Sequence, residues 1–190
     1  MSPDLSRDAT CHKGGMIAVP TLEKRASESL DAHRKGPVMA LRLAFASDHA
    51  AIAMKAALVD HARSLGHDVT DLGPDGEASV DYPDYGYTLA ETIAEGRADR
   101  GIALCGSGIG ISIAVNRHPD LRCALVSEPL SARLCREHND ANAIAMGARL
   151  IGIEQAKACL EAFLSTDFGG ERHQRRVDKL SHPRIAKEPA

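Results

Sequence analysis

The chain has 190 residues, of which 44% are hydrophobic and 26% charged, and this composition fits one globular domain rather than a disordered chain. Its net charge of −3 and aromatic content of 3% give no support for a nucleic-acid partner. No apolar run is long enough to span a bilayer, and residues 1–15 lack the apolar block of a signal peptide. The five cysteines are widely spaced and form no CxxC pair, so we expect no zinc site, no disulfide framework and a cytoplasmic protein.

The first 38 residues differ from the rest because they carry no sustained hydrophobic periodicity. Only Leu22–His33 could form a short helix there. We expect a poorly ordered extension, or a segment that precedes a true translation start at Met39; a regulatory or interface arm is the alternative. The domain itself is predicted over 39–184, followed by a tail at 185–190.

From Met39 onward, strands and helices alternate along the chain. The predicted strands are Leu41–Ala46, His67–Leu72, Gly101–Cys105, Arg122–Val126 and Ala143–Met146. The predicted helices are Ala50–Leu65, Tyr85–Gly96, Ile109–Asn116, Pro129–His138, Ile153–Ser165 and Arg172–Leu180. This alternation predicts an α/β fold: a single-domain, Rossmann-like, doubly wound sheet of five parallel strands with helices on both faces. Ligands bind such sheets at the carboxyl ends of the strands.

The strongest local motif is CGSGIG at residues 105–110, between a buried strand and a helix. Glycines let the backbone approach a ligand closely, and the amides of the turn favour an anion. A tight turn without a ligand is the alternative. Cys105 ends the strand beside these amides, where a thiolate is stabilised and can act as a base or nucleophile. A dinucleotide site fits less well, because the spacing is GxGxG and follows the third strand.

Three other groups of residues are candidates for chemistry. His138 closes a helix that we expect on the ligand side of the sheet, where it can relay protons or simply cap its helix. Asp48 precedes the first helix and is also a good N-cap. Arg172 and Arg176 lie on one helical face and suit a phosphate, or form a solvated basic face. No metal-ligand spacing is visible, so we expect no metal or other cofactor.

Together these segments resemble the ribose-5-phosphate isomerase B family, within a wider group that includes galactose-6-phosphate isomerase subunits. The matching stretches cover roughly 41–182 in family order: SDHA (47–50), DYPDY (81–85), GIALCGSGIGISIAVNR (101–117), SEPLSARLCREHNDANAIAMGAR (127–149) and ERHQRRVDKL (171–180). One branch of the family places a glutamate inside the glycine turn. Here that stretch is Ile109-Gly110-Ile111, so the cysteine branch is the match.

The resemblance implies a role for each matching residue. Cys105 is implied as the base that moves a proton between C1 and C2, His138 as the ring-opening residue, and Asp48 as an assistant at the ring oxygen or a hydroxyl. The turn with Ser107 is implied to stabilise the enediolate. The remaining implied substrate and phosphate contacts are His49, Tyr82, Gly106, Gly108, Gly110, Asn139, Arg149, Arg172 and Arg176.

The expected activity is therefore the interconversion of D-ribose 5-phosphate and D-ribulose 5-phosphate. The same chemistry on erythrulose 4-phosphate, allose 6-phosphate or galactose 6-phosphate is an alternative, and a non-catalytic phosphosugar-binding module is an alternative of another class. The expected partner is a sugar phosphate, with no nucleic acid and no membrane. The resemblance also implies a homodimer, or a dimer of dimers, with the active site at the subunit interface.

Overall fold

The computed structural model describes residues 39–76 and 78–182. The expected extension at 1–38, its helix at Leu22–His33 and the tail at 185–190 lie outside these residues. Within the described ranges, no helix combines the length and apolar character needed to cross a membrane.

One sheet of five parallel strands forms the centre of the domain, in the order β2-β1-β3-β5-β4. The strands are β1 (Arg42–Ser47), β2 (Asp68–Asp71), β3 (Arg100–Cys105), β4 (Cys123–Leu125) and β5 (Ala143–Gly147). Register pairs Ser47 with Leu104, and Cys105 with Gly147. The three central strands therefore end side by side, and their following loops share one edge of the sheet.

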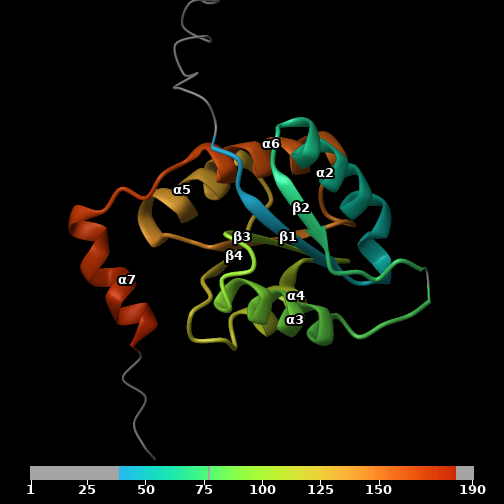
Figure 1. Ribbon diagram of the computed structural model, residues 1–190, viewed down its shortest axis with the longest axis horizontal. Helices are drawn as coiled ribbons and strands as arrows, with labels where there is room; N and C mark the ends of the chain where they lie inside the picture. Colours follow the sequence, from blue (N-terminus) through green and yellow to red (C-terminus); the bar gives the residue numbers. More distant parts are fainter. Residues whose placement is uncertain (1–38, 77, 183–190) are drawn as a thin grey trace, which may run out of the picture. The chain divides into compact units, whose positions relative to one another are not determined.

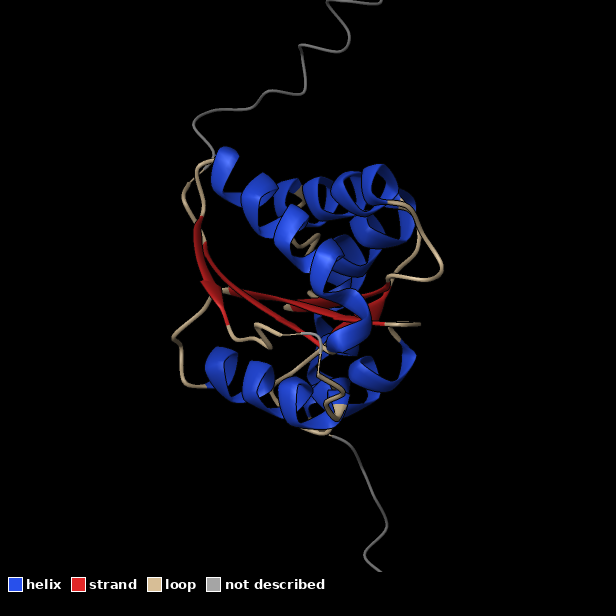
Figure 2. Ribbon diagram, turned by 90° about the vertical axis from the view of Figure 1, so that its right-hand side faces the viewer, coloured by secondary structure: helices blue, strands red, loops and turns tan. Residues whose placement is uncertain are grey.

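Helices cover both faces of this sheet, which confirms the predicted fold class. α2 (Ile52–Ser64), α5 (Pro129–Asn139) and α6 (Ile153–Ser165) lie on one face, and α3 (Tyr82–Ala94) and α4 (Ile109–Val115) lie on the other (Figure 1). Figure 2 shows the sheet edge-on between these two helical layers.

The two faces of the sheet carry side chains of different size. Large residues of the central strands point toward α2, α5 and α6, and they are Leu43, Phe45, Ile102, Leu104, Ile144 and Met146. The opposite face, which we call the alanine face, carries small residues under α3 and α4: Ala44, Ala46, Ala103, Cys105, Ala143 and Ala145. Alternate side chains of a strand point to opposite faces, so this difference follows directly from the sequence.

Small side chains allow α3 and α4 to pack very close to the sheet and to each other. A Cβ on Gly101 of β3 would lie 2.5 Å from Cδ1 of Ile93, and one on Gly86 of α3 would lie 2.8 Å from Cβ of Ala114. Close packing of this kind leaves little room for movement. The glycine turn is therefore held by a rigid layer of the core.

After α6 the chain forms a short 3-10 turn, η2 (Glu171–His173), and then α7 (Gln174–Ser181). The sequence predicted one helix over Arg172–Leu180, and the structure divides it in two. Val177 is the buried residue of α7, whose other residues are largely exposed. α7 lies to one side of the sheet in Figure 1.

Most predicted boundaries agree with the structure to within two residues, and α6 matches at both ends. α3 is the exception, because it begins at Tyr82 rather than Tyr85. Pro83 lies in the first turn of α3, where the missing N–H of proline breaks no hydrogen bond. The prediction wrongly placed this proline outside the helix.

Candidate active site

The glycine turn joins the end of β3 to the start of α4 at residues 105–109. Gly108 has a φ of 76°, a left-handed conformation that favours glycine. A Cβ on Gly108 would also lie 2.8 Å from the backbone carbon of Met146. On the neighbouring strand, a Cβ on Gly147 would lie 2.6 Å from the carbonyl carbon and oxygen of Ser107. Glycine at both positions lets the turn rest directly on β5.

Cys105 ends β3 on the alanine face and is 4% exposed. Its Sγ accepts a hydrogen bond from the backbone N–H of Gly108, at 3.0 Å. Within the described part of the chain, the amides of Gly106 and Ser107 donate to no protein acceptor. A sulfur atom that accepts a hydrogen bond therefore lies beside two free amide donors.

A cavity of about 450 Å³ opens over this turn. That volume is within the range of small-molecule sites. Loops at the carboxyl edge of the sheet supply its lining, which consists of Asp48, Tyr82, Cys105, Gly106, Ser107, Ile109, Gly110, Arg149 and Leu150.

Asp48 follows β1 and is 7% exposed. Its Oδ1 accepts a hydrogen bond from the N–H of Ala50, at 2.9 Å, and so caps the 3-10 turn η1 (His49–Ala51). Its backbone N–H donates to the carbonyl of Leu104, at 3.0 Å, which ties the start of this loop to β3. Asp48 therefore both caps η1 and lines the cavity.

His49 does not line the cavity. Its Nδ1 accepts a hydrogen bond from the N–H of Val80, at 3.2 Å, so the ring holds the loop that leads into α3. His49 therefore follows the cavity-lining Asp48 in the chain, but its ring bonds the loop before α3 instead of facing the cavity over the turn.

Tyr82 and Arg149 both line the cavity and pack against glycines of the turn. A Cβ on Gly110 would lie 2.6 Å from the ring of Tyr82, so the tyrosine needs glycine there to pack over α4. The guanidinium of Arg149 lies over Gly106, where a Cβ would be 3.4 Å from its Cζ. The backbone N–H of Arg149 also donates to the carbonyl of Gly106, at 3.0 Å.

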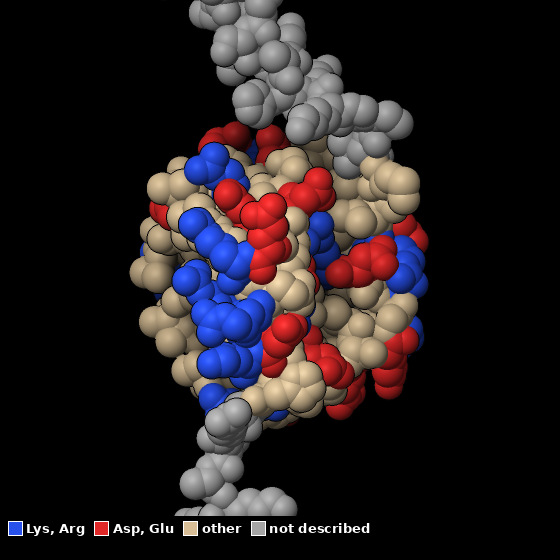
Figure 3. Space-filling view, turned by 90° about the vertical axis from the view of Figure 1, so that its left-hand side faces the viewer, with Lys and Arg blue, Asp and Glu red and all other residues tan. Residues whose placement is uncertain are grey.

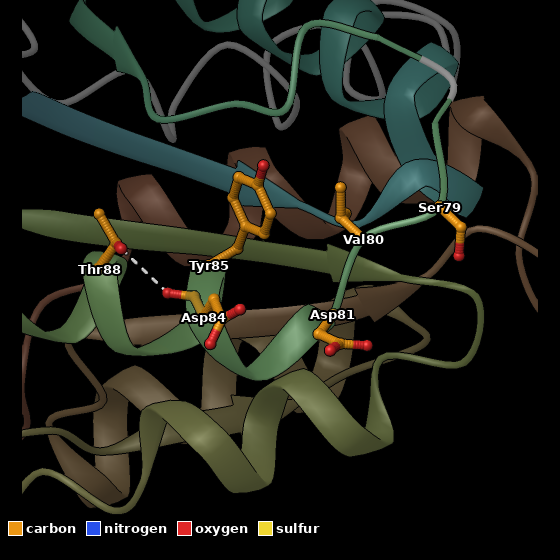
Figure 4. Close-up of a pocket in the computed structure, with 6 residues that line it drawn as sticks. All are labelled: Ser79, Val80, Asp81, Asp84, Tyr85 and Thr88. Atoms are coloured by element: carbon orange, nitrogen blue, oxygen red, sulfur yellow. Dashed lines mark hydrogen bonds between the residues drawn. The ribbon is translucent and has the colours of Figure 1, made fainter.

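A second, open cavity of about 390 Å³ lies along α3 and the loop before it. Figure 4 shows its lining residues, with the ring of Tyr85 directed toward the sheet and Asp81 and Asp84 at the start of α3. The hydroxyl of Thr88 donates to the carbonyl of Asp84, at 2.9 Å. The carboxylates of Asp81 and Asp84 disfavour an anionic ligand, so we do not assign this second cavity to a phosphate.

The structure places His138 and Asn139 at the opposite edge of the sheet, away from the cavity. Both residues lie in the last turn of α5, just before Asp140, which pairs with Arg122 at 2.9 Å immediately before β4. A helix that connects two parallel strands runs against them, so it ends near their amino ends. The expectation that His138 closes its helix on the ligand side of the sheet was therefore wrong for a single copy of the chain.

His138 forms a cluster with the C-terminal segment. Its ring stacks on the ring of His173, with centroids 4.4 Å apart and planes inclined by 10°. The Nε of Arg172 donates to Nε2 of His173 at 3.2 Å, and the N–H of Gly169 donates to the carbonyl of Glu137 at 2.9 Å. We call His138, His173, Arg172 and Arg176 the histidine–arginine cluster.

Positive charge is concentrated around this cluster. Burial lowers the pKa of His173, and the nearby charges of His138, Arg172 and Arg176 lower it further, while Glu137 acts in the opposite direction. Figure 3 shows a band of Lys and Arg on the side of the molecule that carries α7. Arg175, Arg176 and Lys179 of α7 are exposed. The cluster is thus suited to a phosphate group.

Comparisons with known proteins identify the family of this chain. A family model described as Ribose/Galactose Isomerase matches residues 43–180. Ribose-5-phosphate isomerase B of Escherichia coli is 41% identical over 140 residues, which cover 74% of this chain and 94% of that protein. The chain belongs to the ribose/galactose isomerase family.

Two other similar proteins of this family extend the comparison. D-erythrulose-4-phosphate isomerase of Pectobacterium atrosepticum is 40% identical over 144 residues, which cover 75% of this chain and 94% of that protein. The crystal structure of a ribose 5-phosphate isomerase from Thermotoga maritima matches with a TM-score of 0.73 at 45% identity, over 74% of this chain and 97% of that one. The resemblance read from the motifs and the Rossmann-like fold are thereby confirmed.

Sequence reasoning missed three residues that support the site in this family member. Gly147 gives the turn its close contact with β5. Lys55 is 2% exposed, and its Nζ donates hydrogen bonds to Oδ1 of Asp71 at 2.6 Å and to the carbonyl of Pro74 at 2.9 Å. These bonds anchor the loop after β2. His173 lies in the quoted segment ERHQRRVDKL, but only the arginines there suggested a function. A buried lysine or histidine has no periodic signal of its own, so spacing could not single these side chains out.

Proposed function

We propose that the chain is an aldose–ketose isomerase that interconverts D-ribose 5-phosphate and D-ribulose 5-phosphate, with the Cys105 thiolate as its base. The observation that carries this proposal is the Sγ of Cys105 in the cavity, next to the free amides of Gly106 and Ser107. The substrate itself is inferred from family membership and from the name of the similar Escherichia coli enzyme.

The chemical step moves one proton between neighbouring carbons. The thiolate of Cys105 removes the proton from C2 of the open aldose, and the electron pair forms a C1–C2 double bond while the carbonyl oxygen O1 becomes negative. The proton then returns from sulfur to C1, and the proton of the C2 hydroxyl moves to O1, so a ketone forms at C2. The amides of Gly106 and Ser107 would donate to the negative oxygen of the enediolate, and one such donor lowers the barrier by about 3–4 kcal/mol.

Ring opening must precede this step for a furanose. The C1–O4 bond breaks, the ring oxygen gains a proton, and the C1 hydroxyl loses one. We assign the ring-oxygen proton to His138 and the assisting role to Asp48. Tyr82 and Asn139 are proposed to contact sugar hydroxyls, and the proposed substrate and phosphate contacts are His49, Arg149, Arg172 and Arg176.

These assignments need a second copy of the chain, because the cavity and the histidine–arginine cluster lie at opposite edges of the sheet. The surface around the cavity supports this conclusion. Exposed apolar side chains occur at this edge of the sheet: Ile109 and Leu150 line the cavity, and Leu125, Ile113 and Leu130 lie in β4, α4 and α5, with exposures from 47% to 63%. Leu125 lies against Gly108, so the apolar area reaches the turn itself. Such a patch is typical of a protein–protein interface. We propose that it is covered by a partner subunit, which brings its own cluster to the cavity.

Ketose formation from ribose 5-phosphate, compared between the wild type and Cys105→Ala, tests the proposal. We expect the variant to lose at least about a hundredfold in kcat, because a positioned base typically contributes 10²–10⁴ and residues 106–110 of the turn carry no basic side chain. Equal turnover in both proteins would reject Cys105 as the base.

The choice of sugar requires a separate measurement. The 40% identity to a D-erythrulose-4-phosphate isomerase, nearly equal to that with the ribose-5-phosphate enzyme, makes a tetrose phosphate the second candidate. A panel of tetrose, pentose, allose and galactose phosphates, ranked by kcat/KM, decides between them. Tight binding without turnover of any of these sugars would instead favour a phosphosugar-binding module.

A further inference from the structure

His173 is a buried histidine to which the mechanism above gives no role. It ends the 3-10 turn η2 and is 8% exposed, although its neighbours Arg172 and Gln174 are exposed. Its backbone N–H donates to the carbonyl of Gly170 at 2.9 Å, which fixes the turn. The ring lies between the end of α5 and the start of α7. It contacts both His138, the proposed ring-opening residue, and Arg172, a proposed phosphate ligand.

The contact with Arg172 defines the protonation state of His173. A guanidinium has only donors, so Nε2 of His173 must offer a lone pair to accept the Nε–H of Arg172. The neutral ring then carries its proton on Nδ1. The charges that face this ring are those of His138 and Glu137 on α5, Arg172 on η2 and Arg176 on α7. Three of the four are basic, so the surroundings favour the neutral ring.

The contact with His138 covers one face of that imidazole. The rings are nearly parallel, and the side chain of His138 remains 36% exposed. The nearest acidic group to its Nε2 is Oε1 of Glu137, at 3.8 Å, which is too long for a hydrogen bond. The stack on His173 is thus the main contact that fixes the direction of this ring.

We propose that His173 is a positioning residue that holds the phosphate-binding Arg172 and the ring-opening His138 in one fixed arrangement. Arg172 is oriented through the hydrogen bond and His138 through the stack, so a phosphate bound at the arginines places the sugar ring against His138. This inference rests on the proposed function for the roles of Arg172 and His138.

Two variants separate the two contacts of His173. His173→Phe keeps an aromatic ring to stack on His138 but removes the acceptor for Arg172. His173→Gln keeps an acceptor oxygen but removes the ring. His182→Gln is the control, because His182 is exposed at the end of α7 and lies outside the cluster.

For His173→Phe we expect about tenfold higher KM for the sugar phosphate and about tenfold weaker binding of inorganic phosphate, with kcat within about twofold. A hydrogen bond to a charged group supports a change of this size. For His173→Gln we expect the reverse: kcat falls about tenfold, while phosphate binding stays within about twofold of wild type. The control should match the wild type in every measurement.

Equal losses of kcat and phosphate binding in both variants would overturn the proposal, since they indicate a merely structural role. NMR of the His138 ring protons gives a signature that needs no turnover. The stack should shift these resonances in wild type and in His173→Phe, and His173→Gln should lose the shift. If the wild type isomerises no sugar phosphate, the proposed function fails, yet phosphate titration and the NMR shift still decide the positioning role.

Discussion

The four cysteines in the described part of the chain lie in different environments. Burial raises the pKa of Cys135 and Cys159 to about 11, and it raises the pKa of Cys123 further. A raised pKa keeps these three groups as thiols at neutral pH, and thiols are poor nucleophiles. Cys105 differs from them because it lines a cavity and its Sγ accepts a hydrogen bond from the backbone N–H of Gly108.

We therefore predict that iodoacetamide at pH 8 inactivates the enzyme by alkylating Cys105 and leaves the three structural cysteines unmodified. Peptide mass mapping identifies the modified residue, and a saturating sugar phosphate should slow the reaction. Cys105→Ala, which keeps the other cysteines, is the control for labelling elsewhere. Inactivation with label on Cys11 alone would contradict the assignment of Cys105.

His67 provides a second prediction at the level of a single residue. It is 7% exposed, and its Nδ1 accepts the N–H of Leu41 at 3.2 Å. Burial, followed by the charge of Arg100, lowers its pKa below the ordinary value of 6.5. Between this lowered pKa and 6.5, the unfolded chain therefore binds more protons here than the folded chain does, and this favours unfolding.

The free energy of unfolding should consequently fall as the pH drops through about 6.5. Urea denaturation at pH 5, 6, 7 and 8 measures this slope for the wild type and for His67→Asn, which keeps an acceptor but cannot titrate. The variant should have a shallower slope. Some slope remains, because the lowered pKa of His173 acts in the same direction. Identical slopes would show that His67 is not the group responsible.

At the level of elements, the glycine turn depends on a neighbour far away in the sequence. Gly147 of β5 supports the turn because a side chain there would collide with the backbone of Ser107. The CGSGIG motif is visible in the sequence, but its contact with β5 depends on strand order, which spacing does not reveal.

Gly147→Ala should displace the turn and lower kcat by at least about tenfold, because small misplacements at a catalytic centre have large effects. Gly152→Ala is the matched control. Gly152 is the N-cap of α6, and a Cβ added to it would meet nothing within 4 Å, so activity should be unchanged. Steady-state kinetics and thermal unfolding measure both variants. A fully active Gly147→Ala would show that the turn tolerates displacement from β5.

Local patterns predicted most elements well, and their failures have physical causes. Apolar periodicity located all five strands and the whole of α6. α3 began earlier than predicted because proline is tolerated in a first helical turn. The C-terminal helix is divided at His173, where burial of a polar ring, which has no periodic signal, joins the chain to α5.

At the level of the whole molecule, the candidate site residues form two groups. Asp48, Tyr82, Arg149 and most residues of the turn, with the exception of Gly108, line one cavity. His138 lies at the other edge because the helix of a βαβ unit runs back toward the amino ends of the strands. Arg172 lies there because its neighbour His173 stacks on His138. A linear sequence does not record which copy of a chain supplies a residue, so this division could not be predicted from spacing.

A mixing experiment tests whether two copies complete one site. Cys105→Ala and His138→Ala should each be inactive alone. When they are unfolded together in equal amounts and refolded, random pairing gives hybrids with one intact site, so about a quarter of wild-type activity should return. Refolding each variant by itself is the control. A mixture that stays inactive, although hybrids form, would reject a shared site.

The alanine face also bears on how such an enzyme can change its substrate. Cys105 lies among alanines that pack against α3 and α4. Even a methyl group on Gly86 would collide with Ala114, and one on Gly101 would collide with Ile93. Larger side chains on this face would therefore require α3 or α4 to move away from the sheet. We expect adaptation to longer or shorter sugars to alter the rim, where Tyr82, Arg149 and Leu150 are exposed, while the proton-transfer chemistry below is inherited unchanged.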